Sequence, residues 1–142
     1  MVMKYWKHLI DVYESWDLDS LCDEAYDLSC AVRDDINRRF DVRDPLYATM
    51  MVGAYFVDAD HFADGDEDAL FRRMFEGQPL DLSAHRFLLE YRRNNWQPWV
   101  ENYLRNSSSS SLEAALRFGI VICAADGFIR EEEKERILKW VK

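Results

Sequence analysis

The sequence has few of the residues that interrupt or cross-link a chain. Its 142 residues include five glycines, three prolines and three cysteines. The odd number of cysteines and the absence of a Cys-x-x-Cys spacing argue against a disulfide framework. Because Cys22, Cys30 and Cys123 each lie in an apolar helical pattern, we expect them to be reduced thiols packed in the core.

Long hydrophobic runs are also missing. No apolar stretch approaches the roughly 20 residues that a membrane-spanning helix needs. The first residues lead directly into a polar, amphipathic segment and lack the continuous apolar region of a secretory signal. We therefore expect a cytoplasmic protein with no membrane insertion.

Positive charge is scarce. The chain has 18 lysines and arginines against 27 aspartates and glutamates, which gives a formal net charge of −9 at pH 7. Nucleic acids need a basic surface, so this balance excludes them as the natural partner. It also disfavours anionic membrane surfaces. A cation or a basic protein partner fits the charge better.

Hydrophobic residues are abundant, at 49% of the chain, and they recur at helical spacing. Helices are expected at about 5–16, 21–40, 46–57, 70–75, 84–91, 99–104, 112–125 and 137–141. The helix at 46–57 is apolar on all sides, as in a central buried helix, and Asp44-Pro45 is a typical start for it. Ser110 and Glu113 form a capping-box pattern before the helix at 112–125. We predict an all-α fold, a compact bundle of seven to eight helices forming one domain over residues 1–142.

The expected helix at 21–40 has one apolar face and one charged face. The residues on its charged face are Asp23, Glu24, Asp27, Arg33, Asp34, Arg38 and Arg39.

Two segments of the chain repeat each other. When Gly53 is aligned with Gly119, a shift of 66 residues (53 to 119), the two copies share an apolar helix, an Ala-Asp-x-Phe turn and a glutamate seven residues after the aspartate. The paired acidic residues are Asp60 with Asp126 and Glu67 with Glu133. The matching hydrophobic register indicates a duplication. The first repeat covers about 45–77 and the second about 111–142, and the N-terminal helices at 4–40 lie outside both.

The second copy carries a family resemblance. Residues 121–133 (VICAADGFIREEE) resemble the Ala-Asp-Gly turn of TerB-like (tellurite-resistance) proteins, which also occurs in the N-terminal module of certain membrane-anchored J-domain co-chaperones. The resemblance implies an all-helical fold with two pseudo-symmetric helix-turn-helix repeats. It also implies a divalent cation site shared by the two acidic turns, formed by Asp60, Glu67, Asp126 and Glu133. The chain departs from the pattern in having His61 where the second copy has Gly127, and Arg130 where a short capping residue is usual.

The chemistry of the turns leaves two interpretations open. Hard cations prefer several converging carboxylate oxygens, and Asp58, His61 and Asp64 would add ligands or negative potential. Alternatively, Asp64 and Glu67 form a capping box, the glutamates at 131–133 favour a helix N-terminus, and Asp126-Gly127 simply ends a helix. A calcium EF-hand is excluded, because starting the loop at Asp60 or at Asp64 places a phenylalanine at position 12.

Motifs for nucleophilic, phosphate-binding or zinc-protease chemistry are absent, and the three histidines are scattered. The sequence therefore favours a non-enzymatic TerB-like binding or stress-response module. The alternative is an acidic adaptor or immunity-type protein that docks a basic partner, and a metal-dependent hydrolase is a weaker third hypothesis.

Trp96 and Trp99 flank a proline and either close the core or form a protein-binding patch.

Overall fold

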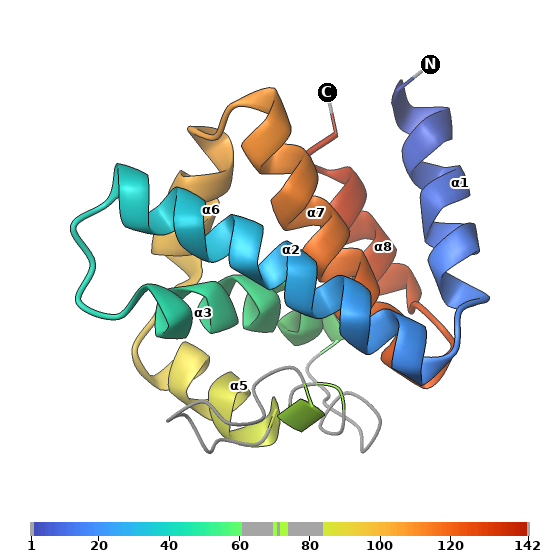
Figure 1. Ribbon diagram of the computed structural model, residues 1–142, viewed down its shortest axis with the longest axis horizontal. Helices are drawn as coiled ribbons and strands as arrows, with labels where there is room; N and C mark the ends of the chain where they lie inside the picture. Colours follow the sequence, from blue (N-terminus) through green and yellow to red (C-terminus); the bar gives the residue numbers. More distant parts are fainter. Residues whose placement is uncertain (1, 61–69, 71, 74–83, 142) are drawn as a thin grey trace.

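The chain folds as a bundle of helices in the computed structural model, which describes residues 2–60, 70, 72–73 and 84–141 (Figure 1). Those residues form seven α-helices and two short 3-10 turns, with no strand among them, so the all-α prediction is confirmed. The expected helix at 70–75 lies mostly outside the described residues. No described helix has the length and apolar character needed to cross a membrane. The elements are α1 (Val2–Glu14), α2 (Leu18–Arg39), α3 (Pro45–Val57), η1 (Asp58–Asp60), α5 (Ala84–Arg93), α6 (Gln97–Arg105), α7 (Ser109–Cys123), η2 (Ala124–Asp126) and α8 (Glu131–Leu138).

Short polar side chains set where three of these helices begin. The Asp17 carboxylate accepts a hydrogen bond from the Ser20 N–H at 2.7 Å before α2, and Asp44 does the same for the Tyr47 N–H at 3.1 Å before α3. These side chains satisfy amide groups that have no partner inside the helix. The expected cap at Ser110 is wrong: Ser108 is the N-cap of α7. The α7 helix therefore begins within the serine run, at Ser109, rather than at about residue 112.

The core is built around α3 and α7. Every residue of α3 from Ala48 to Val57 is buried, and so is most of α7 from Ala115 onward. The two helices contact each other, α2 packs along both of them, and α5 covers another side of α3 (Figure 1). A helix that is apolar on all sides requires neighbours on all sides, which is why these two segments lie at the centre.

Two glycines let α3 and α7 approach closely. A methyl group added at Gly119 would lie 2.5 Å from Cδ2 of Phe56, and one added at Gly53 would lie 2.8 Å from Cδ1 of Ile122. Contacts this short do not occur between real carbon atoms, so no side chain fits at either position without movement. Each glycine therefore accepts a large side chain of the opposite helix, and the two helices interlock.

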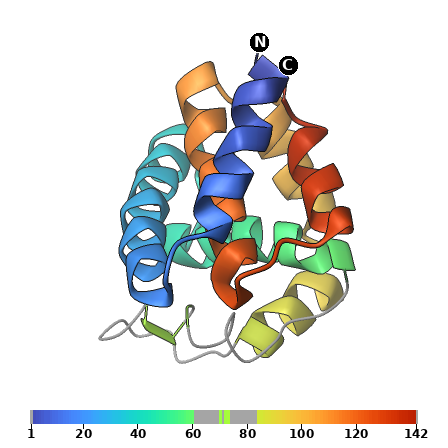
Figure 2. The same cartoon turned by 90° about the vertical axis from the view of Figure 1, so that its right-hand side faces the viewer.

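The remaining helices lie on the outside of this pair. Figure 2 shows α1 on the surface, beside α7 and α8, and both of these contacts are present in the structure. The face of α1 that packs on the core carries Trp6, Ile10 and Tyr13.

We predict that Gly119→Ala destabilises the protein by about 1–3 kcal/mol, the usual cost of overpacking a tight core. Gly53→Ala should cost less, because the added methyl meets the flexible end of Ile122 rather than the ring of Phe56. Urea unfolding followed by circular dichroism measures both. An unchanged midpoint for Gly119→Ala would show that α3 and α7 are free to separate.

Candidate functional site

Each of the two acidic turns begins directly after a buried helix. The η1 turn follows α3 directly, the η2 turn follows α7 directly, and Asp60 and Asp126 are the last residues of the two turns. The side chains of these two aspartates, together with His61, Asp64 and Glu67, lie outside the described part of the structure. Asp58 and Glu133 are the predicted site residues whose side chains can be placed.

Asp58 forms a buried ion pair. Its side chain is 10% exposed, and its Oδ1 atom accepts a hydrogen bond from Nε of Arg92 at 2.6 Å. Arg136 lies on the other side, with Nη1 3.9 Å from Oδ2 of Asp58, and donates to the Tyr55 carbonyl oxygen at 2.8 Å. Two arginines from α5 and α8 thus hold the carboxylate at the end of α3. These partners of Asp58 were not predictable from the sequence, because they come from distant helices.

Glu133 supports the start of α8. It is 2% exposed, and its carboxylate accepts the Arg130 N–H at 2.9 Å. This contact is the glutamate half of a capping box, with Arg130 in the N-cap position. Gly127, at φ 84°, ends η2 in the left-handed conformation that glycine adopts readily. Glu133 and Gly127 therefore have the helix-capping and helix-ending roles that the sequence analysis considered as the alternative to a cation site.

In the described part of the chain, no group of three or more His, Cys, Asp or Glu side chains is placed to hold a metal ion. The predicted cation site is only partly described there, since the side chains of Asp60, Glu67 and Asp126 fall outside it. The four-residue site stays a prediction.

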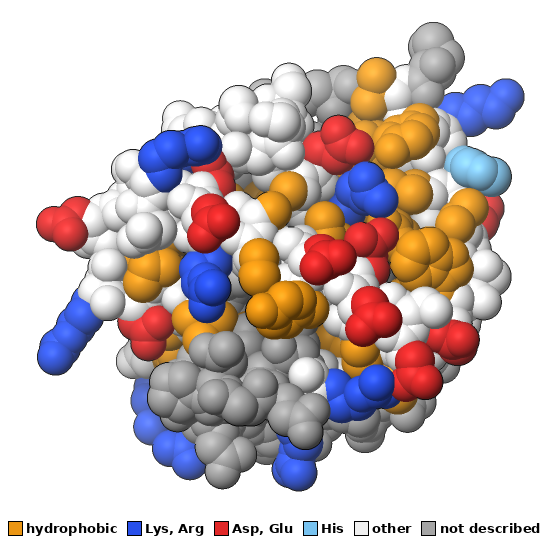
Figure 3. All heavy atoms as spheres, in the orientation of Figure 1, with side chains coloured by type: hydrophobic (Ala, Val, Ile, Leu, Met, Phe, Trp, Pro, Cys, Tyr) orange, Lys and Arg blue, Asp and Glu red, His pale blue; other side chains and the backbone are white. Residues whose placement is uncertain are grey.

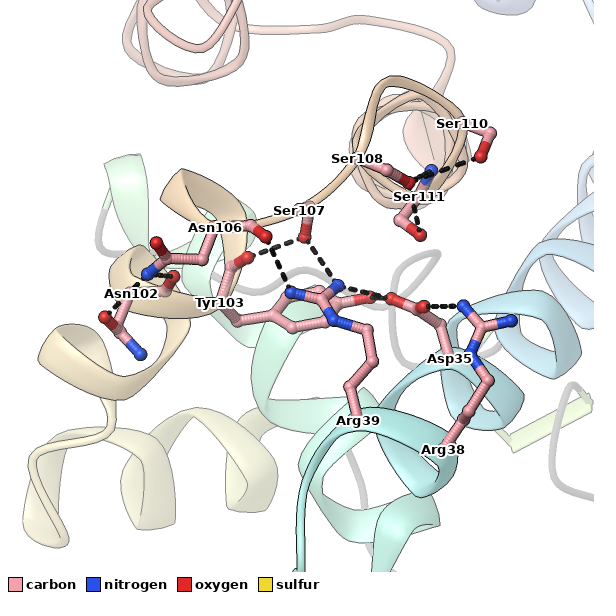
Figure 4. Close-up of polar contacts among 10 residues, drawn as sticks. All are labelled: Asp35, Arg38, Arg39, Asn102, Tyr103, Asn106, Ser107, Ser108, Ser110 and Ser111. Carbon is pink, nitrogen blue, oxygen red and sulfur yellow. Dashed lines mark hydrogen bonds and ion pairs between the residues drawn. The ribbon is translucent and has the colours of Figure 1, made fainter.

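A second buried carboxylate, Asp35, lies between α2 and α6 (Figure 4). Its Oδ2 atom accepts hydrogen bonds from the Tyr103 hydroxyl and from Nη1 of Arg39, both at 2.8 Å, and its Oδ1 atom accepts from Nη2 of Arg38 at 2.6 Å. Arg39 continues the network to the Asn106 carbonyl oxygen at 2.9 Å and to the Ser107 hydroxyl at 3.1 Å. The cluster fixes the loop between α6 and α7 to the C-terminal turns of α2.

These contacts determine the proton affinity of Asp35. Burial raises its pKa, but hydrogen bonds from Tyr103, Arg39 and Ser111 and the charge of Arg39 outweigh burial and lower the pKa below its ordinary value. A depression of about 210 Å³ borders the cluster and is lined partly by Asp34, Ser110 and Ser111. A carboxylate held ionised in this way is a poor general base near neutral pH, where a pKa close to the working pH is needed. The cluster is suited to holding structure together rather than to moving protons.

The outer face of α2 carries a row of acidic side chains. Asp23, Asp27 and Asp34 are exposed, and none of them makes a hydrogen bond or ion pair within the described residues. Tyr26 projects among them with 49% of its surface exposed. Acidic side chains gather over the part of α2 toward α1 in the space-filling view (Figure 3). We call Asp23, Glu24, Asp27 and Tyr26 the acidic face of α2.

The acidic face is hollowed on one side. A depression of about 440 Å³ is lined by Cys22, Asp23, Tyr26, Asp27 and Arg73. Arg73 forms an ion pair with Asp19 and is the basic side chain lining this hollow. The charged side of α2 was predicted from the sequence, whereas its exposure beside a hollow depends on the packing of α2.

The tryptophan pair belongs to an aromatic cluster at the edge of the core. Trp96 and Trp99 are half-buried and pack against core residues, with their ring centroids 5.2 Å apart. Trp99 also stacks on Tyr103 with an interplanar angle of 5°. The interpretation in which these aromatics close the core is the one the structure shows. An apolar hollow of about 540 Å³ remains between Val42, Tyr47 and Trp96.

The three cysteines are free thiols, as expected. Cys22 and Cys123 are buried, and Cys30 is half-buried.

No family model, curated protein or solved structure matches this chain. The resemblance to TerB-like proteins therefore rests on the residues of the second acidic turn and stays a prediction.

We predict that Asp35→Asn lowers stability at pH 7 by about 2–3 kcal/mol, because it leaves buried donors without an ionised acceptor. The pKa of Asp35 is lowered in the folded state, so its stabilising effect is present above the unfolded pKa of about 4 and is lost as the pH falls below it. Urea unfolding between about pH 7 and pH 3 measures the free energy of unfolding at each pH. This free energy should fall less steeply toward low pH for Asp35→Asn than for the parent. If the free energies of unfolding of the two proteins fell equally with pH, ionised Asp35 would not stabilise the fold.

Proposed function

We propose that this protein is a non-enzymatic binding module whose acidic face of α2 docks a basic segment of a protein partner. The observation that carries the proposal is the row of exposed carboxylates at Asp23, Asp27 and Asp34 on one helix, none of which forms a hydrogen bond or ion pair with another described residue, in a chain with a net charge of −9. Like charges four residues apart, such as Asp23 and Asp27, destabilise a helix. A basic partner bound to this face of α2 would offset the repulsion between these aspartates.

Electrostatic complementarity mainly supplies the rate and selectivity of docking. A docking site also needs a contact that excludes water, and aromatic side chains commonly provide it. Tyr26 is placed for this role, because it is exposed between Asp23 and Asp27 and lines the same hollow. The acidic face thus combines charge with an aromatic anchor.

The remaining carboxylates favour binding over catalysis. Asp35 and Asp58 are each held by arginines, and Glu133 accepts a backbone N–H. Burial raises the pKa of Tyr13 and of Tyr55 to about 12, which keeps both hydroxyls neutral. These three carboxylates are engaged in holding helices in place, and none of them is free to act as a general base.

A relationship to TerB-like proteins through duplication is part of the proposal. Two observations support it. The α3 helix ends at Val57 and is followed by η1 at 58–60, while α7 ends at Cys123 and is followed by η2 at 124–126, so the two pairs are offset by 66 residues (58 to 124). The contact of Gly119 with Phe56 is also the counterpart of the contact of Gly53 with Ile122 under the same shift.

The duplication gives a second candidate function, a cation-linked module. Asp60 and Asp126 close equivalent turns, at the ends of two helices that contact each other. Converging carboxylates at such a junction would suit a divalent cation.

For the acidic face, we predict that a fluorescent octalysine peptide binds the parent protein and that Asp23→Asn/Asp27→Asn weakens binding about fivefold, since exposed charge pairs contribute roughly 0.2–1 kcal/mol each. Fluorescence anisotropy at about 50 and about 300 mM NaCl measures the affinity, which salt should reduce by screening. Glu132→Gln/Glu135→Gln is the matched control, because it removes the same charge from exposed positions on α8. Equal losses in both variants would show that only net charge matters and would refute a dedicated acidic face.

For the cation candidate, the test is a thermal-unfolding series on chelator-treated protein with calcium, magnesium, manganese or zinc. A cation that binds the folded state raises stability by about 2.7 kcal/mol at 100 times its dissociation constant. The rise should disappear in Asp60→Asn/Asp126→Asn and persist in the surface control Asp41→Asn. If no cation shifts the transition, the paired turns are not a metal site.

A further inference from the structure

The α1 helix carries a second apolar stripe beside the face that packs on the core, and two of its residues, Leu9 and Trp16, are partly buried against that core. Val2, Tyr5, Leu9 and Val12 follow one another at steps of three and four residues, and Trp16 continues the series just beyond the helix. Val2 is 54% exposed and Tyr5 47% exposed. This spacing is the one used at seams between helices. We call these residues the α1 stripe.

The α1 stripe and the acidic face belong to one continuous surface. The Tyr13 hydroxyl on α1 donates to Oε2 of Glu24 on α2 at 2.8 Å, and Arg117 on α7 donates to the same hydroxyl at 2.7 Å. The Tyr5 hydroxyl lies 3.5 Å from Oε1 of Glu113 on α7. In the space-filling view, hydrophobic side chains follow α1 and acidic side chains lie next to them over α2 and α7 (Figure 3).

We propose that this surface receives a basic amphipathic α-helix, with the apolar face of that helix on the α1 stripe and its basic face toward Asp23, Glu24 and Asp27. The inference rests on the proposed function and names the class of partner. A helix that docks in this way lays its own apolar residues, spaced three and four apart, on a hydrophobic surface of the receiving protein. The α1 helix has 13 residues and is about 20 Å long, enough to support roughly four turns of a partner helix.

The charge distribution selects this partner over a second copy of the chain. The stripe alone could pair with itself, but each copy carries a net charge of −9 and an acidic face beside the stripe. Two copies joined along antiparallel α1 helices would bring their acidic faces toward each other, and like charges in apposition oppose association. A basic helix meets both the apolar and the acidic parts of the surface favourably.

The test compares two synthetic peptides of about 18 residues with the same leucine and lysine composition. In one, the leucines recur at steps of three and four so that they form a single face, and in the other their order is scrambled. Anisotropy measures affinity for the parent protein, and circular dichroism follows helix formation in the peptide. We expect the amphipathic peptide to bind at least about tenfold more tightly than the scrambled one, which corresponds to about 1.4 kcal/mol.

Variants then test the α1 stripe and the acidic face independently. Tyr5→Ser/Val12→Ser should remove the preference for the amphipathic peptide, whereas Asp23→Asn/Asp27→Asn should weaken binding of both peptides. Leu89→Ser is the control, because Leu89 is an exposed apolar residue on α5, at 44% exposure. The thermal transitions of all variants show that each is folded.

Several outcomes would overturn the inference. Equal affinity for the two peptides, with no effect of the stripe variant, would remove the helix partner and leave the acidic face as a docking site for basic segments in general. Failure of these peptides and of octalysine to bind would remove the proposed function itself. Sedimentation that shows a dimer of the parent, dissociated by Tyr5→Ser/Val12→Ser, would assign the α1 stripe to a second copy.

Discussion

The close approach of α3 and α7 is the constraint on which the rest of the fold depends. Gly53 and Gly119 allow each helix to receive a large side chain of the other, so neither helix can slide along its neighbour. Their ends fix the positions of η1 and η2, and the arginines of α5 and α8 reach Asp58 at the first of these turns. The crossing of α3 and α7 thus determines where η1 and η2 lie. The contacts of α5 and α8 with Asp58 at η1 then orient these two outer helices.

Carboxylates divide into two classes by their surroundings. Those inside, such as Asp35 and Asp58, accept hydrogen bonds from arginine, as a buried charge requires to offset its desolvation. Those on the outer face of α2, such as Asp23 and Asp27, face solvent and have no hydrogen bond or ion pair within the described chain. The first class joins helices, and the second produces a local field that extends about one Debye length into solution. This division is the physical basis for interpreting the protein as a binding module.

Much of the architecture was predictable, because local chemistry determines it. Asp44-Pro45 predicted the start of α3, and the fully apolar stretch that follows predicted its burial. Asp35 gave a weaker signal: it lies three residues after Val32 and just before Ile36, on the buried side of α2. The partners of Asp35 and Asp58 were not predictable, since Tyr103, Arg92 and Arg136 come from helices distant in sequence. The start of α7 was misjudged because Ser108, Ser110 and Ser111 offer similar caps, and nothing local distinguishes them.

Asp19, Asp23 and Asp27 are spaced four residues apart, so their like charges repel one another along α2. Each step of four residues brings two like charges together and costs the helix roughly 0.2–0.5 kcal/mol. Arg73 forms an ion pair with Asp19 and also attracts Asp23 electrostatically, so the repulsion along the helix is partly offset. A ligand that brings positive charge to this surface relieves the repulsion, so part of its binding free energy comes from strain already present in the unbound protein. Binding of such a ligand would therefore raise the folding stability of the protein.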